Sequence, residues 1–212
     1  VPCHSISVGS LRPRRRAPMK IGFLGGSFDP VHFGHLIAAQ DVLEQFQLDR
    51  LLLVPAAQAP LKPNDVQSTV EDRLAMLQAA TEWDRRLEIS DHELRKGGIS
   101  YTVDSVRHFR RQFPQDELFW IIGGDQLPQL HKWKEISELV KLIEFIYLER
   151  PKHPTKPHVE IDGLRLHRCD GHLIEISSSE LRGRVFTGRS LHYFCPQKVI
   201  AYIEDRKLYR DQ

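Results

Sequence analysis

The chain has 212 residues, of which 41% are hydrophobic, so it can bury a sizeable core as one domain or as a domain with a small appendage. Its longest apolar runs, residues 51–57 and 118–122, are far too short to cross a bilayer, and no apolar run near the start resembles a secretory signal. We therefore expect a soluble, cytoplasmic protein with no membrane partner.

The formal net charge of +2 is unevenly distributed along the chain. Residues 1–18 hold four arginines and no acidic residue, which leaves 26 basic against 28 acidic residues in the rest. This body lacks the basic excess typical of nucleic-acid binding, so no nucleic-acid partner is expected. The cysteines, Cys3, Cys169 and Cys195, lack metal-finger spacing and are expected to be ordinary thiols.

Residues 1–18 have no hydrophobic period and end just before Met19. We interpret them as a disordered tail or as upstream sequence included by a wrong start assignment; the alternative is an organelle-targeting peptide containing Arg and Ser. Residues 19–212 are expected to form a single domain.

From Met19 onward, short apolar runs alternate with helical patterns. In chain order, the sequence first predicts a strand at 20–24, a helix at 34–46, a strand at 50–55 and a loop at 56–67. A capping box at 68–71 opens the next helix, with Val70, Leu74 and Leu77 inward, and a strand at 87–90 and a helix at 103–113 follow. The rest of the chain is predicted to hold a strand at 118–122, a helix at 136–142, a strand at 144–148, a strand near 173–176, a helix from about 178 and a final helix from Pro196 through Ile203. This alternation predicts an α/β fold: a Rossmann-like parallel sheet flanked by helices on both faces, with a small C-terminal helical part. Ligands of such sheets bind beyond the carboxyl ends of the strands.

A glycine pair and two histidines follow the first predicted strand. Gly25 and Gly26 permit positive φ and allow a ligand to approach the backbone closely. His32 and His35 are three residues apart, so they share a face at the start of a helix, where the helix dipole and the backbone N–H groups attract phosphate oxygens. A histidine pair at this spacing is more often a surface pair or a pair of metal ligands, so these residues alone indicate no more than a phosphate site.

A second polar segment opens the helix predicted from about residue 178. Ser177, Ser178 and Ser179 can cap this helix and leave its N–H groups facing phosphate oxygens. Arg182, one turn further, can make a forked contact with phosphate oxygens. Taken alone, the segment is better interpreted as an ordinary serine cap with a solvated arginine.

The two segments together resemble a known pair of motifs. Residues 25–35 resemble the H-x-G-H signature of the nucleotidyltransferase superfamily, and residues 176–182 resemble its ISSTxxR partner, with Ser179 where the family often has Thr. Over nearly all of residues 19–210 the chain resembles bacterial-type nicotinate-nucleotide adenylyltransferases. The finer matches are a Pro/basic loop at 59–63 with Leu61 where the family commonly has His, Ser100-Tyr101-Thr102, the turn Gly123-Gly124-Asp125, and Trp133.

The resemblance implies transfer of AMP from ATP to nicotinate mononucleotide, giving deamido-NAD and pyrophosphate, with Mg²⁺ bound through the ATP phosphates. It assigns His35 to the α-phosphate, and His32 and Arg182 to the β and γ groups. The residues it places at ATP are Gly25, Gly26, Ser27, Phe28, His32, His35, Asp125, Ile176, Ser177, Ser178, Ser179 and Arg182. Those it places at the nicotinate nucleotide are Lys62, Tyr101, Thr102, Trp133 and Lys134, although Lys134 can equally point into solvent.

No protein side chain is assigned firmly to the metal; Asp125 is expected to contact ribose hydroxyls or to organise the bound metal. A homo-oligomer is compatible with the sequence. Three alternatives remain open: an adenylyltransferase acting on nicotinamide mononucleotide or phosphopantetheine, a non-catalytic adenine-nucleotide sensor, and a fragment of a class I aminoacyl-tRNA synthetase. The last would need a KMSKS loop and a basic appendage, and neither is evident.

Overall fold

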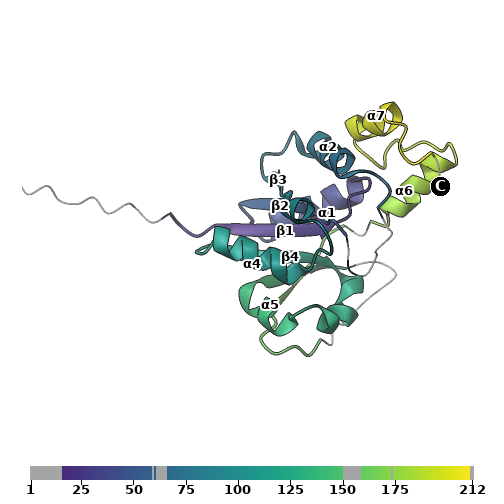
Figure 1. Cartoon of the computed structure of the whole chain (residues 1–212). Helices are drawn as coiled ribbons and strands as arrows, with labels where there is room; N and C mark the ends of the chain where they lie inside the picture. Colours follow the sequence, from purple (N-terminus) through teal and green to yellow (C-terminus); the bar gives the residue numbers. More distant parts are fainter. Residues whose placement is uncertain (1–15, 59, 61–65, 150–158, 173, 211–212) are drawn as a thin grey trace, which may run out of the picture.

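The computed structural model describes residues 16–58, 60, 66–149, 159–172 and 174–210. In them, six parallel strands form one sheet in the order β3-β2-β1-β4-β5-β6 (Figure 1). The strands are β1 Lys20–Gly26, β2 Arg50–Pro55, β3 Leu87–Ile89, β4 Glu117–Gly123, β5 Glu144–Leu148 and β6 Leu166–Cys169. The helices are α1 Phe33–Gln45, α2 Val70–Thr81, α3 His92–Lys96, α4 Thr102–Gln112, the 3-10 helix η1 Gly124–Lys132, α5 Ile136–Leu142, α6 Ser178–Phe186 and α7 Gln197–Asp205.

The order of the strands reverses at the centre of the sheet. From β1 the chain first moves outward through β2 and β3, then returns to place β4 on the other side of β1. Gly26 of β1 pairs with Pro55, and Leu24 pairs with Ile121 of β4, so the carboxyl ends of these strands lie side by side. Such a reversal opens a crevice beyond the strand ends where ligands bind. The Rossmann-like fold expected from the sequence is confirmed.

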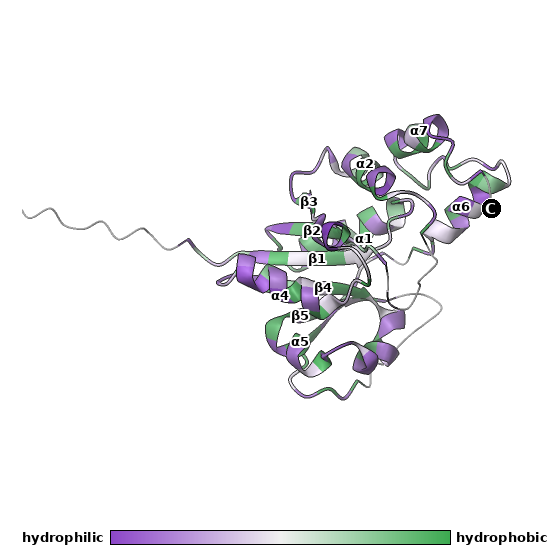
Figure 2. Cartoon of the chain, viewed as in Figure 1, coloured by the Kyte–Doolittle hydropathy of each residue, from purple (hydrophilic) through white to green (hydrophobic). Residues whose placement is uncertain are grey.

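Helices cover both faces of the sheet because its strands are apolar on both sides. In β2, Leu51 and Leu53 belong to the core beneath α1, α2, α6 and α7, whereas Leu52 and Val54 belong to the core beneath α4 and α5. Full burial of one such side chain contributes about 1.5–3 kcal/mol. Figure 2 shows β4 in green, as expected of a strand covered on both faces, and much of α4 in purple where the helix meets solvent.

The capping box of α2 lies one residue later than the sequence predicted. Thr69, not Ser68, is the N-cap, and its hydroxyl accepts a hydrogen bond from the backbone N of Asp72 at 3.1 Å. The Ser68 hydroxyl donates instead to the carboxylate of Asp29, which explains why it does not cap the helix. Val70, the first residue of α2, is 36% exposed, so its predicted inward position was wrong.

The strand predicted near residues 173–176 was also wrong. Residues 174–177 carry no strand, and residue 173 lies outside the described part of the chain. The sixth strand is β6, whose Leu166 pairs with Phe145 and whose Cys169 pairs with Leu148. β6 lies at the edge of the sheet and its middle residues, His167 and Arg168, are polar, so its sequence lacks the apolar run that marks the inner strands. The short helices α3 and η1 were not predicted either.

The C-terminal helical part is confirmed as α6 and α7, and α7 packs on α2, where Tyr202 donates to Asp72 at 2.9 Å. At the other end of the chain, Arg16 pairs with Asp116 at 2.7 Å, and residues 1–15 lie outside the described part. Cys169 and Cys195 are buried free thiols. None of the helices in the described residues is long and apolar enough to cross a membrane.

Two stacked histidines join α3 to α4. The rings of His92 and His108 lie 3.8 Å apart between centroids, at 10° between planes. Burial lowers the pKa of His92, helped by its neighbour His108 and by Lys96, and burial also lowers the pKa of His108, helped by Arg111 and Arg95. The folded protein therefore favours the neutral form of both rings.

This pair predicts a loss of stability in acid. A histidine whose pKa is lowered on folding binds its proton more readily in the unfolded chain, so its neutral form stabilises the fold fully above the ordinary value of 6.5, and this stability is lost as the pH falls below 6.5 toward the folded pKa. We expect the urea midpoint to fall between pH 7.5 and 5 more steeply in the wild type than in a His92→Gln/His108→Gln double variant. Parallel pH profiles of the two proteins would contradict this.

Candidate active site

A cavity of about 530 Å³ opens beyond the carboxyl ends of β1 and β4, where the strand order reverses. This volume lies in the usual range for small-molecule sites. The predicted site residues in its wall are Gly25, Gly26, Ser27, Tyr101, Thr102, Asp125, Trp133 and Lys134. The fold therefore brings together residues from the end of β1, the start of α4 and both ends of η1.

Close packing, not positive φ, explains the glycine pair. A Cβ on Gly25 would lie 3.1 Å from the ring of Trp120 in β4, and a Cβ on Gly26 would lie 3.2 Å from the ring of Phe28. The residue of this loop that adopts positive φ is Phe28, at 49°. The freedom of Gly25 and Gly26 to adopt positive φ is therefore not used here. The ring of Phe28 is buried in the core and meets His35 edge-on at 4.9 Å.

Aromatic and basic side chains gather at the end of the cavity formed by α4 and η1. Trp133 follows η1, is partly buried and packs edge-on against Phe145 at 6.2 Å. Lys134 places its Nζ 4.5 Å from the centre of the Tyr101 ring and 3.9 Å from a carboxylate oxygen of Asp104. Lys134 therefore contacts the wall of the cavity and does not simply extend into solvent.

The two histidines of the first motif lie together at the start of α1. His32 is the N-cap residue, His35 lies in the first turn, and their rings stack at 3.7 Å between centroids. A Cβ on Gly34 would lie 3.0 Å from Nδ1 of His32 and 3.5 Å from Cβ of Ile176. The glycine between the histidines is therefore needed for close packing, and it brings Ile176 of the second motif against the first.

The second motif docks directly on the first. Ser177 caps α6 by accepting from the backbone N of Glu180 at 3.2 Å, as the sequence predicted. The hydroxyl of Ser178 donates to the carbonyl of Pro30 at 2.9 Å, and Nη1 of Arg182 donates to the carbonyl of Asp29 at 2.8 Å. The Arg182 side chain is 8% exposed, so it is largely buried, and its hydrogen bond to Asp29 holds the first motif in place.

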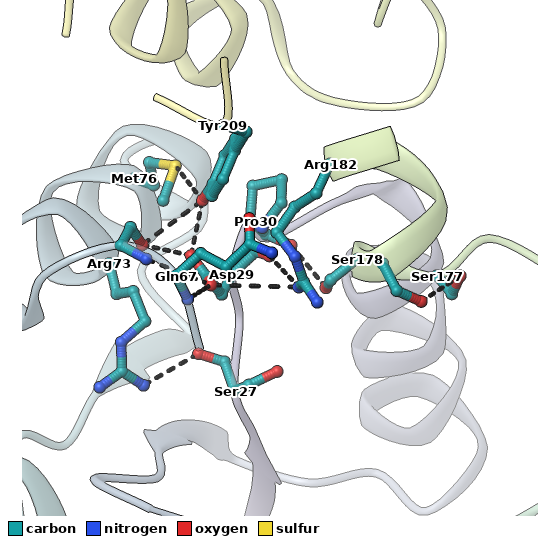
Figure 3. A network of polar contacts seen from close by, with 12 residues as sticks. Ser27, Asp29, Pro30, Gln67, Arg73, Met76, Ser177, Ser178, Arg182 and Tyr209 are labelled. Carbon is teal, nitrogen blue, oxygen red and sulfur yellow. Dashed lines mark hydrogen bonds and ion pairs between the residues drawn. The ribbon is translucent and has the colours of Figure 1, made fainter. Parts of the chain in front are cut away.

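Asp29 lies at the centre of a buried polar network (Figure 3). Its side chain is fully buried and accepts hydrogen bonds from the backbone N of Gln67 at 2.6 Å, from the hydroxyl of Tyr209 at 2.6 Å and from the hydroxyl of Ser68. These donors come from the segment before α2 and from the end of the chain. The network therefore ties the loop that carries the histidines to two distant segments of the chain.

A buried arginine completes this support. Arg73 of α2 is 1% exposed and donates to the carbonyls of Ser27 at 3.1 Å and Ala56 at 2.6 Å. Burial lowers the pKa of Arg73, while the negative charge of Asp29 opposes that shift. Neither Asp29 nor Arg73 was identified as a site residue from the sequence. The available signal was a charged residue on the apolar side of α2, next to Met76 and Leu77.

The structure does not bring every predicted residue into the cavity wall. Phe28, His32 and His35 lie further along the segment that follows β1, and the second motif lies at the start of α6; none of them is in the wall. Lys62 lies outside the described residues. Asp125 is exposed in the first turn of η1. The wall also contains residues that the sequence did not single out, among them Glu93, Gln126, Gln129 and Lys132.

Comparison with known proteins gives one consistent result. Residues 23–184 match the family model described as cytidylyltransferase-like. The chain is 72% identical over 192 residues to a probable nicotinate-nucleotide adenylyltransferase of Opitutus terrae, covering 91% of this chain and 98% of that protein. It is 38% identical over 198 residues to one of Gemmatimonas aurantiaca, covering 91% and 93%.

Solved structures agree on the fold. The nicotinic acid mononucleotide adenylyltransferase of Plasmodium falciparum complexed with NaAD superposes with a TM-score of 0.73 at 20% identity, covering 90% of this chain and 97% of that one. The same enzyme complexed with APC gives a TM-score of 0.70 at 19% identity, with the same coverage. Together with the sequence matches over most of the chain, the paired motifs and the cavity place this protein among its relatives: it belongs to the cytidylyltransferase-like family and, within it, to the nicotinate-nucleotide adenylyltransferases.

Proposed function

We propose that this protein transfers AMP from ATP to nicotinate mononucleotide, giving deamido-NAD and pyrophosphate. The observation that carries the proposal is the contact between the two motifs: Arg182 and Ser178 donate to the backbone of the loop that carries His32 and His35. This contact joins two motifs from distant parts of the sequence, and the first of them begins at Gly25 and Gly26 in the cavity wall. The names of the relatives support the choice of acceptor.

The reaction suits the groups present. The attacking 5′-phosphate is already an anion, so no activated nucleophile or strong general base is required, and catalysis consists of in-line positioning and stabilisation of charge. We assign His35 to the α-phosphate and His32 to the β and γ phosphates. The serines at the start of α6 contribute backbone N–H groups toward the triphosphate. We assign Arg182, whose Nη1 donates to the carbonyl of Asp29, to the leaving pyrophosphate.

The acceptor is assigned to the end of the cavity between α4 and η1. Trp133 stacks on the pyridine ring, and the backbone near Tyr101 and Thr102 meets the nicotinate carboxylate. Lys134, beside the Tyr101 ring, adds a positive charge that favours an acidic acceptor over a neutral amide. We also assign Lys62 to the nicotinate nucleotide. Gly25, Gly26, Ser27 and Phe28 form the ATP side of the β1 loop, together with Asp125 and Ile176.

Mg²⁺ fits this site as an ion carried by the substrate. No cluster of three His, Cys, Asp or Glu side chains suited to a metal is present among the residues that the structure describes. Mg²⁺ commonly keeps several waters and binds through substrate phosphates with one or two carboxylates. Bound in this way it would neutralise charge on the triphosphate, and Asp125 on the cavity wall is the side chain we assign to it or to the ribose hydroxyls.

A pyrophosphate-release assay tests the proposal. The protein is incubated with ATP, Mg²⁺ and one of three acceptors: nicotinate mononucleotide, nicotinamide mononucleotide or phosphopantetheine. We expect kcat/KM for nicotinate mononucleotide to exceed the other two by about tenfold or more, a difference of about 1.4 kcal/mol in transition-state binding. Preference for another acceptor would overturn the choice of substrate. Binding of ATP without release of pyrophosphate would indicate a nucleotide sensor.

A further inference from the structure

Glu93 is a carboxyl group in the cavity wall that has no role in the reaction proposed above. It lies in α3, is 5% exposed and lines the cavity together with Ser100, Tyr101 and Thr102. Burial of a carboxyl group is costly unless hydrogen bonds compensate it. The contacts of Glu93 should therefore explain why a carboxyl group occupies this position.

The Glu93 carboxyl group joins three segments of the chain. It accepts a hydrogen bond from the hydroxyl of Ser105 in α4 at 2.5 Å, and it also interacts with the hydroxyl of Ser100. The oxygen of Ser100 in turn accepts from the backbone N of Ala57, after β2, at 3.0 Å. The backbone N of Ser100 donates to the carbonyl of Gln58 at 2.9 Å. Glu93 thus ties α3, α4 and the loop after β2 to Ser100.

The position of α3 against α4 is set on both sides of Glu93. The residue before it, His92, stacks on His108, and Lys96 at the end of α3 pairs with Asp104 at 2.6 Å. Between the two helices the chain turns through Gly97 and Gly98, both at positive φ. These outer contacts are made by exposed or half-buried side chains. Glu93 is buried and lines the cavity, so it supplies the contact between α3 and α4 that reaches the cavity wall.

Tyr101 and Thr102 directly follow the serine that Glu93 holds. Tyr101 is the N-cap residue of α4 and Thr102 is the first helical residue, so their backbone N–H groups lie at the end of the helix that faces the cavity. A displacement of Ser100 moves both. Site residues that are held by a second layer of hydrogen bonds keep their geometry, and loss of that layer weakens binding even though the site residues remain.

We propose that Glu93 is a positioning residue for the acceptor: through Ser100 and Ser105 it sets the place of Tyr101 and Thr102 in the cavity wall. This inference rests on the proposed function only for the identity of the acceptor. A catalytic role is not needed, because the reaction uses no general base and the carboxyl group is engaged by two hydroxyls. Burial raises the pKa of Glu93, which favours its neutral form and reduces repulsion of an acidic acceptor.

Steady-state kinetics of Glu93→Ala test the proposal. We expect KM for nicotinate mononucleotide to rise by about tenfold or more, while KM for ATP stays within about twofold, because only the acceptor segment loses its support. Glu93→Gln keeps a carbonyl oxygen that accepts from the serines, so it should restore KM to within about threefold of the wild type. Equal changes in both KM values, or no difference between Ala and Gln, would overturn the proposal.

A second measurement does not depend on the reaction. Hydrogen exchange of the amides of residues 99–105 should become faster in Glu93→Ala, while that of β1 and β4 is unchanged. Unchanged exchange in residues 99–105 would overturn the positioning role even if the protein proved inactive on nicotinate mononucleotide. Inactivity together with faster exchange would contradict only the proposed function.

Asp116→Asn serves as the matched control. Asp116 is also a carboxyl group that is 5% exposed, but it lies before β4, at the opposite end of the sheet from the cavity, where it accepts from the backbone N of Met19 at 2.8 Å. It should lower the thermal midpoint without changing either KM. If Glu93→Ala fails to fold, Ser105→Ala removes one of the two hydroxyls and should give a smaller rise in the acceptor KM of the same kind.

Discussion

Replacement of His35 by alanine is expected to reduce kcat by about 10²–10³-fold, the usual cost of removing one hydrogen-bond donor that stabilises transition-state charge. His35 stands in the first turn of α1, half-buried, with its ring between that of His32 at 3.7 Å and that of Phe28 at 4.9 Å. The position of the His35 ring is therefore fixed by these two contacts in the absence of substrate. Since the group acts on charge that develops in the transition state, KM for ATP should change far less than kcat.

The measurement is the rate of pyrophosphate release as a function of ATP concentration at a saturating acceptor concentration. The thermal midpoint is recorded for each variant. His131→Ala is the control, because His131 is an exposed histidine of η1 outside the cavity wall. It should retain wild-type turnover. A His35→Ala enzyme that works within about threefold of the wild type would remove His35 from its assigned role.

Replacement of Asp29 by alanine is expected to destabilise the fold by about 3–5 kcal/mol, the range found when one member of a buried charged pair is removed. Three donors would lose their acceptor: the backbone N of Gln67 and the hydroxyls of Ser68 and Tyr209. Arg73 would also lose the negative charge that offsets its burial. The lost contacts span the loop after β1, the segment before α2 and the end of the chain.

Urea unfolding followed by circular dichroism measures this change. Tyr209→Phe removes only one hydroxyl from the network and should cost about 1–2 kcal/mol, so the two variants separate the charge of Asp29 from a single hydrogen bond. A loss of less than about 1 kcal/mol for Asp29→Ala would mean that the donors find other partners. Turnover should also fall in this variant, because the same loop carries His32 and His35.

The inner strands and the longer helices could be predicted because their side-chain patterns are local. β2, α5 and β5 have the bounds expected from the sequence, since apolar runs and helical periodicity depend only on neighbouring residues. β6 was misplaced because an edge strand with a polar middle lacks that pattern. The cap of α2 was misplaced because Ser68 is used by Asp29, which is 39 residues away along the chain.

The groups that we assign to the site could also be recognised from the sequence. Residue types, spacing and positions near predicted helix starts singled out His32, His35, Ser177 and Arg182, and the family resemblance gave them their proposed roles. These residues carry two imidazoles, a capping hydroxyl and a guanidinium, and the sequence alone sets the identity of these groups. The family resemblance also supplied the residues that we assign to the acceptor, and four of them line one cavity: Tyr101, Thr102, Trp133 and Lys134.

Only the tertiary structure decided which groups support the site. The distances that matter join Asp29 to Tyr209, Arg182 to the carbonyl of Asp29, and Glu93 to Ser105. None of these contacts leaves a periodic pattern in the sequence, because each joins residues on different elements whose separation depends on how the sheet is wound. The sequence by itself therefore determined the order of the inner strands and longer helices and the side chains that we assign to the reaction. Burial and long-range hydrogen bonding arise only when the chain packs, and they decided which carboxyl groups and arginines hold those side chains in place.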